Sequence, residues 1–333
     1  MEQLMSLMMP NRIDNSHGHG HVLIVARYHI PRLAELAKQY RERTGFSVGL
    51  WQMAEERGID MASIAPIYHK FDYVLRHYYR DPLWNEPTNQ LHLRALGNLT
   101  CAAGAGAGNN AQHDLPSPAA QNSMYPKWGL HWVMLDAKDP YLMTTQRRNV
   151  ASHWPIAQRQ IECEFQGSDP TPKFGQSANN YERGEMKTAL HNVGQLPKQQ
   201  QQQCTISFTP QFGKGSGPFQ YHSKLANTKI CPSPRGWAVE THRMTEAMIQ
   251  GCVPAVKDEP YLHKLFRPPP VIVGQNWTEL ARNIQYYLQR PEELQQLSTS
   301  GVEFIQEYQQ CVRQDLDYIL QHAFGLVVPL SST

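Results

Sequence analysis

The sequence predicts an α/β protein made of two doubly wound domains in tandem. Short apolar runs alternate with helical patterns along most of the chain, which is typical of βαβ units around a parallel sheet. The alternation is interrupted near the middle of the chain and then restarts. The 333 residues are enough for two domains that each bury a core of their own.

The first predicted domain, residues 21–154, opens with a strand and a helix. Residues 21–26, HVLIVA, are apolar and rich in β-branched side chains, so they predict a buried strand. Residues 30–45 have helical spacing and end at Gly45, and FSVGLWQM predicts the next strand. The runs IYHKFDYVLRHYYR and LHLRALG continue the alternation, and GLHWVML fits either a strand or a loop edge.

Two segments of this half have compositions that do not predict regular structure. Residues 1–20 form a leader that we interpret as disordered, and residues 101–125 are rich in Ala, Gly, Pro and Asn without any periodicity. His17, His19 and His21 alternate with glycine at the end of the leader. Both a metal-binding role and a flexible lead-in to the first strand fit that run.

The second predicted domain, residues 155–325, repeats the alternation. Its predicted strands are, in order, residues 160–168, 204–210, 230–234, 252–256 and 269–273. Its predicted helices are residues 182–193, 219–229, 243–250, 278–290 and 292–324. Ligands of open α/β sheets bind beyond the carboxyl ends of the strands, so two such domains place the expected site in a cleft between them.

Charge and composition exclude some classes of protein. The formal net charge is +2 and the charges are scattered, so a nucleic-acid-binding surface is not supported. No apolar run reaches the length of a transmembrane helix, and we expect membrane attachment only through a segment outside this chain. The six cysteines lack a CxxC pair, which argues against a zinc ribbon, and Cys252 is expected to be a small buried hydrophobe.

The short helix at residues 243–250 carries one apolar face and one polar stripe. At about 100° per residue, Arg243, Glu246 and Gln250 fall together, whereas Met244 and its apolar neighbours face the sheet. The helix start points to the carboxyl end of the preceding strand, where backbone N–H groups favour an anion. Arg243 could bind a diphosphate and Glu246 a ribose diol. A solvated Arg–Glu surface pair fits the spacing equally well.

The segments CPSPRG and THRMTEAMIQGCVPAV resemble the signature of exostosin-type glycosyltransferases. The matching positions are Cys231, Pro232, Gly236, Thr241, Arg243, Glu246, Ala247, Gly251, Cys252 and Pro254. The resemblance extends upstream through FQGS and ERGEMKTAL and covers about residues 155–290. LWQMAEERG, YHKFDYVLRHYY and LRALG resemble, more loosely, the acceptor domain of xylosyltransferase-like members.

The resemblance implies a GT-B fold, in which two Rossmann-like domains face a central cleft. It also implies a nucleoside diphosphate sugar as donor, an inverting transfer to a hydroxyl of a glycan or glycoprotein, and a place in the Golgi or secretory lumen. The sequons at Asn98 and Asn276 are compatible with a lumenal protein. A catalytically silent glycan-binding or scaffold protein is the alternative, and a sugar-nucleotide epimerase is a weaker third.

The signature and the ends of the predicted strands together indicate which residues bind the donor. They are Arg243, Glu246, Thr241, Gly236, Arg235, Lys214 and Arg76. Two of these have alternatives that the sequence leaves open. Lys214 follows a strand and belongs either near the donor phosphates or to a flexible loop, whereas Arg76 belongs either to the cleft or to buried packing of Tyr78 and Tyr79.

The implied catalytic base is an acid after the strand that ends in VGLWQM. Relatives often carry an Asp-Glu pair there, and this chain has Glu55 and Glu56, which also fit a solvated helix start. No cofactor is expected. Asp315 and Asp317 form a DxD match, but they lie in an amphipathic helix, so we predict that no metal is required.

Overall fold

The computed structural model describes residues 21–26, 30–52, 66–77, 93–95, 130–132, 154–168, 178–193, 204–209, 215–236 and 239–324. These residues fall into two compact units, each with one five-stranded parallel sheet, as the alternating patterns predict. The long helix α10, Pro291–Phe324, belongs to the second unit up to Gln310 and to the first from Cys311 onward. None of the described helices is both apolar and long enough to cross a bilayer.

The first unit holds the sheet with strand order β1-β2-β3-β5-β4. The strands are β1 (His21–Ala26), β2 (Ser47–Gln52), β3 (Tyr73–Arg76), β4 (Leu93–Ala95) and β5 (Leu130–Trp132), and helix α2 is Ile30–Thr44. Ile30, Ala34 and Ala37 of α2 pack on the sheet beside Leu50. The helix ends where Gly45 takes a φ of 71°, as the sequence predicts, because glycine adopts this left-handed conformation without a Cβ clash.

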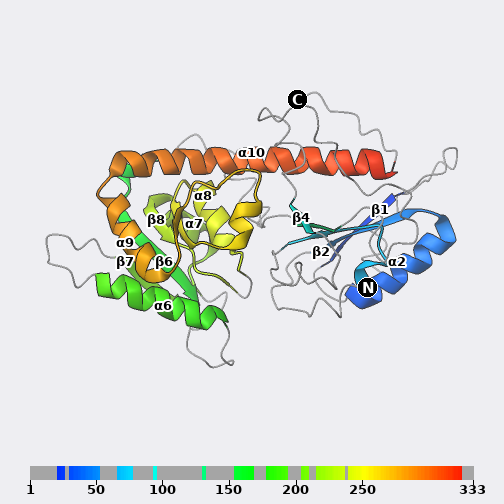
Figure 1. Ribbon diagram of the computed structural model, residues 1–333, viewed down its shortest axis with the longest axis horizontal. Helices are drawn as coiled ribbons and strands as arrows, with labels where there is room; N and C mark the ends of the chain where they lie inside the picture. Colours follow the sequence, from blue (N-terminus) through cyan, green and yellow to red (C-terminus); the bar gives the residue numbers. More distant parts are fainter. Residues whose placement is uncertain are drawn as a thin grey trace. The chain divides into compact units, whose positions relative to one another are not determined.

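The second unit runs from green to orange in Figure 1 and has strand order β10-β9-β8-β6-β7. The strands are β6 (Ile161–Ser168), β7 (Cys204–Thr209), β8 (Thr228–Pro232), β9 (Val253–Lys257) and β10 (Ile272–Gly274). The helices are α6 (Ala178–Val193), α7 (Pro218–Asn227), α8 (His242–Ile249) and α9 (Trp277–Leu288), with 3-10 turns η3 (Ile156–Gln158) and η5 (Pro260–Lys264). The direction of winding reverses between β6 and β8, and such a switch point is where open α/β sheets bind ligands.

The two faces of this sheet differ in chemistry. Helices α6 and α9 contact each other, and their apolar side chains, such as Met186 and Leu280, cover Phe165 of β6 in the main core. On the other face, α7 and α8 enclose a much smaller core that includes Leu225 and Ala247. Because side chains alternate along a strand, the residues between the apolar positions of β6 face α7.

A buried arginine ties the start of the second unit together. Arg159 follows η3, and its guanidinium donates to three backbone carbonyls, those of Trp154 at 3.1 Å, Thr228 at 2.8 Å and Gln250 at 3.2 Å. Burial lowers its pKa to about 10. The three bonds fix the entry to β6, the start of β8 and the end of α8 relative to one another.

Disulfides correct the expectation for Cys252. Its side chain is buried as predicted, but it is bonded to Cys231 instead of lying alone in the core. A second disulfide joins Cys163 to Cys204 across the paired strands β6 and β7, and Cys311 is also disulfide-bonded. Scattered cysteines give no sign of their pairing in sequence, because the fold decides which ones meet.

Candidate functional site

The segment between β8 and β9 has well-defined ends. Thr241 is the N-cap of α8, and its side-chain oxygen accepts a hydrogen bond from the backbone N–H of Arg243 at 3.4 Å. The helix ends at Ile249, and the φ of 66° at Gly251 allows the chain to turn into β9. The Cys231–Cys252 disulfide joins the two ends, so the segment that resembles the glycosyltransferase signature is closed into a loop.

Arg243 reaches from α8 to the carboxyl-terminal half of β6. Its guanidinium lies 4.4 Å from the centre of the Phe165 ring, and its Nη2 donates to the carbonyl oxygen of Gln166 at 2.5 Å. Its Nε is buried and has no hydrogen-bond partner among the described residues. A Cβ at Gly167 would lie 2.6 Å from the Phe165 ring and 3.3 Å from Arg243 Nη2, so a glycine at this position leaves room for the arginine.

Glu246 lies one turn further along α8 and is also partly buried. Tyr221 of α7 donates its hydroxyl proton to Oε2 of Glu246 at 3.0 Å. Burial raises the pKa of Glu246, while the charge of Arg243 and the bond from Tyr221 act in the opposite direction. Arg243 and Glu246 therefore each bond to another element of the unit, which disfavours the solvated surface pair as an explanation of their spacing.

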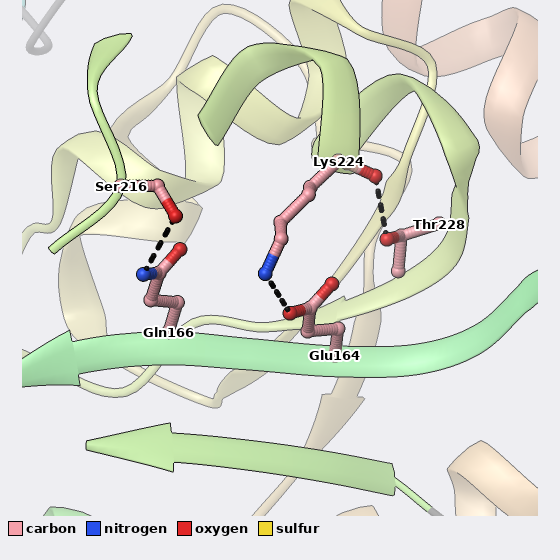
Figure 2. Close-up of polar contacts among 5 residues, drawn as sticks. All are labelled: Glu164, Gln166, Ser216, Lys224 and Thr228. Atoms are coloured by element: carbon pink, nitrogen blue, oxygen red, sulfur yellow. Dashed lines mark hydrogen bonds and ion pairs between the residues drawn. The ribbon is translucent and has the colours of Figure 1, made fainter. Parts of the chain in front are cut away.

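A small pocket lies between α7 and the sheet, beside Arg243. Its lining consists of Glu164, Gln166, Tyr221, Lys224, Leu225, Thr228 and Arg243. Figure 2 shows Lys224 reaching down to Glu164, whose Oε1 lies 3.1 Å from the ammonium nitrogen, and Gln166 donating to Ser216 at 3.0 Å. The Oε1 atom of Gln166 is buried without a partner among the described residues. The pocket is thus polar at both ends.

Arg235 lies in a neighbouring cluster at the ends of β8 and β9. Its backbone N–H donates to Oε1 of the buried Glu182 at 3.0 Å, and Lys257 lies 3.8 Å from the other oxygen. Burial raises the pKa of Glu259 beside them, and the charge of Lys257 opposes that rise. Gly236 follows Arg235 in the loop, where a Cβ would meet nothing within 4 Å, so its glycine is not required by space.

Of the remaining predicted site residues, one belongs to the other unit and the rest lie outside the described residues. Arg76 belongs to the first unit, where it is fully buried at the end of β3 and donates to the Tyr68 hydroxyl at 2.7 Å. Its role in donor binding stays a prediction. Lys214, Glu55 and Glu56 lie outside the described residues, so the predicted phosphate contact and the predicted base stay predictions as well.

Sequence reasoning missed Tyr221, Gln166 and the Glu164–Lys224 pair. A signal for them was present in β6, where residues 161–166 alternate as IECEFQ and place acids and an amide on one face of a central strand. A central strand with a polar face needs polar partners from the helix above it. The sequence does not show which helix supplies them.

Asp315 of the DxD match is completely buried in α10. Within the part of the chain that the structure describes, no three His, Cys, Asp or Glu side chains come together as a metal site. The leader histidines His17 and His19 lie outside that part. Metal independence stays a prediction that needs an assay.

Comparisons with known proteins concern the fold and part of the second unit. Residues 210–321, which include α7, α8 and the segment between β8 and β9, match a family model described as glycosyl transferase-like. The α,α-trehalose 6-phosphate synthase of Burkholderia multivorans has a similar structure, with 10% identity, a TM-score of 0.51, and coverage of 97% of this chain and 75% of that chain.

Two further structures match at lower similarity. One is sucrose-phosphate synthase from Thermosynechococcus elongatus, with 13% identity, a TM-score of 0.38, and coverage of 91% of this chain and 99% of that one. The other is Anabaena HepE in complex with UDP, with 11% identity, a TM-score of 0.36, and coverage of 90% and 99%. No curated protein sequence matches the chain. The chain has the GT-B fold, as predicted, and its residues 210–321 are similar to glycosyl transferases.

Proposed function

We propose that the protein is a glycosyltransferase that binds a nucleoside diphosphate sugar at α8 and transfers the sugar to a hydroxyl group. The observation that carries this proposal is the placement of Arg243 and Glu246, one turn apart, at the switch point of the second sheet. The glycosyl transferase-like match spans this helix and supports the same reading.

Arg243 is suited to the diphosphate. Within the described residues its Nε has no hydrogen-bond partner, and the guanidinium lies near the start of α8, where the helix dipole favours negative charge. As the sugar leaves, charge grows on the diphosphate, and a fixed cation stabilises that charge without reorganisation. Glu246 would accept hydrogen bonds from the ribose diol through its carboxylate oxygens.

The acceptor hydroxyl needs a general base as it attacks the anomeric carbon. Glu55 and Glu56 remain our proposal for that role. We also propose the finer assignment that the sequence signature implies, an exostosin-type inverting transfer to a glycan or glycoprotein without a metal cofactor. The disulfides fit a protein of an oxidising compartment such as the Golgi or secretory lumen, because cytosolic thiols are kept reduced.

Isothermal calorimetry with a panel of nucleoside diphosphates tests the donor site. Arg243→Ala should weaken binding of the best ligand by about 1.5–3 kcal/mol, the scale of hydrogen bonds to a charged group. Because Arg243 also bonds to Gln166, Arg243→Lys is included to keep the charge while losing the forked geometry. Arg282→Ala, an exposed arginine of α9, is the matched control and should bind as the wild type does.

Two results would contradict the proposal. If the folded wild-type protein binds none of the diphosphates, α8 is not a donor site. If Arg243→Ala and Arg282→Ala bind equally well, Arg243 has only its structural role. A protein that binds a donor but transfers sugar to no acceptor in a screen would instead support the catalytically silent alternative.

A further inference from the structure

Tyr221 of α7 is in contact with Glu246 and lines the same pocket as Arg243. Its hydroxyl donates to Oε2 of Glu246 at 3.0 Å, and it lines the pocket together with Arg243. Its ring packs against the small core that Ala247 and the Cys231–Cys252 disulfide help to form. The tyrosine is therefore held by packing on one side and aims its single O–H at the carboxylate.

The Tyr221 hydroxyl is a permanent donor in this setting. Burial raises the pKa of Tyr221 far above the physiological range, and the charge of Arg243 only partly opposes that rise. A protonated phenol has one proton to give, and Glu246 takes it on Oε2. A carboxylate has further lone pairs, and hydroxyl groups of a ligand would bond to those.

We propose that Tyr221 is a positioning residue of the donor site, which fixes the orientation of the Glu246 carboxylate and favours its ionised form. This inference rests on the proposed function, because it needs a ribose diol as the group that Glu246 accepts. It extends that function to α7, which the sequence signature does not include. Ribose recognition would then depend on the contact between α7 and α8 as well as on the polar stripe of α8.

The other groups around Glu246 decide how strongly the tyrosine matters. Arg243 from the same helix favours the ionised carboxylate, as Tyr221 does. Lys224 from α7 and Glu164 from β6 line the pocket beside Tyr221 and Arg243, but they pair with each other at 3.1 Å, so their charges largely cancel. Tyr221 and Arg243 are thus the two groups that oppose the effect of burial on Glu246.

The expected effect on pH dependence has a definite sign. Burial raises the pKa of Glu246, and the hydrogen bond from Tyr221 lowers it. Loss of the hydroxyl therefore raises the pKa further, so the carboxylate becomes protonated at a higher pH. Since a protonated Glu246 has lost acceptor capacity, diol binding should fail at a higher pH in Tyr221→Phe than in the wild type.

Calorimetry from acidic to neutral pH tests this with UDP and GDP as probes, each beside its 2′,3′-dideoxy counterpart. Tyr221→Phe should weaken binding of the better ribose nucleotide about tenfold, since a bond to a charged group is lost. Binding of the dideoxy counterpart should change far less. The pH below which affinity for the ribose nucleotide is lost should be higher in Tyr221→Phe than in the wild type. Tyr286→Phe, a half-exposed tyrosine of α9, is the matched control.

A double-mutant cycle separates positioning from packing. In a Glu246→Gln background, Tyr221→Phe should cause almost no further loss of diol discrimination. Equal losses for ribose and dideoxy nucleotides, or an unchanged pH profile, would show that Tyr221 only packs. Failure of the wild type to bind either nucleotide would instead overturn the proposed function itself, so the two failures are distinguishable. The melting temperature of Tyr221→Phe detects poor folding. In that event the diol discrimination of Glu246→Gln, measured at each pH, shows whether Glu246 must be ionised to bind the diol.

Discussion

Removal of the Cys231–Cys252 disulfide should lower the affinity for the donor, although neither cysteine is proposed to contact the ligand. The two cysteines are 21 residues apart, and between them lie Thr241, Arg243 and Glu246. Closing a loop of this length restricts the unfolded chain, which contributes about 3 kcal/mol to the free energy of unfolding. The Cys163–Cys204 disulfide, with a separation of 41 residues, should contribute about 4 kcal/mol on the same basis.

The two disulfides should differ in their effect on binding. Cys163 and Cys204 sit opposite each other on β6 and β7, whose backbone register is already fixed by hydrogen bonds. Cys231 and Cys252 instead join the two ends of the segment that carries α8. Without this disulfide only β8 and β9 hold the ends, so the segment can adopt more conformations. Ordering a long side chain on binding costs roughly 0.5–1.5 kcal/mol, so two such side chains predict a loss of about 1–3 kcal/mol in donor affinity.

The assay compares Cys231→Ala/Cys252→Ala with Cys163→Ala/Cys204→Ala. Urea denaturation should show that both double variants unfold at lower concentrations than the wild type, with similar losses. Calorimetry with the best nucleoside diphosphate should show weaker binding only for the variant without the Cys231–Cys252 bond. An equal loss of affinity in both variants, or no loss in the first, would refute the idea that this bond orders the donor site.

The other predictions concern charge, anchoring and metal. Burial raises the pKa of Glu246 in the folded state, so ionisation of this carboxyl group opposes folding as pH rises. At neutral pH, Glu246→Gln should therefore have a melting temperature no lower than that of the wild type. The same variant should lose its discrimination between ribose and dideoxy nucleotides. Arg159→Met removes three hydrogen bonds to backbone carbonyls and should cost about 3 kcal/mol in urea denaturation, whereas Arg282→Met should change little. Transfer should survive EDTA, and activity that is lost on chelation and restored by manganese would contradict the predicted metal independence.

Local patterns were enough to predict the kinds of element and most of their positions. Residues 46–53 were predicted as a strand and β2 spans 47–52, and residues 243–250 were predicted as a helix and α8 spans 242–249. Apolar periodicity and a capping threonine are properties of neighbouring residues, so sequence shows them directly. The strand order depends on pairing between distant segments, and no local pattern specifies that β6 lies between β7 and β8.

In the candidate site, too, local sequence predicts some of the residues, whereas their partners depend on the fold. Arg243 and Glu246 share a face because of helical geometry, so their spacing predicts that they act together. Their partners are distant in sequence, since Tyr221 lies 25 residues from Glu246 and Gln166 lies 77 residues from Arg243. The pairing of Cys252 with Cys231 was missed for a related reason, because six cysteines allow about 15 connectivities and only the fold selects among them.

The difference between the two faces of the second sheet explains how one domain can be stable and still carry a polar site. Phe165 and its apolar neighbours on β6 pack under α6 and α9, and that dry layer supplies most of the burial. Glu162, Glu164 and Gln166 alternate with them and face the other way, where Lys229 and Lys224 pair with the acids at 2.7 Å and 3.1 Å. A polar inner face costs stability unless each group has a partner, so a face of this kind is expected where a ligand is to be bound. Because Phe165 also supports the Arg243 guanidinium, β6 is the strand through which the apolar core fixes the position of the proposed donor arginine.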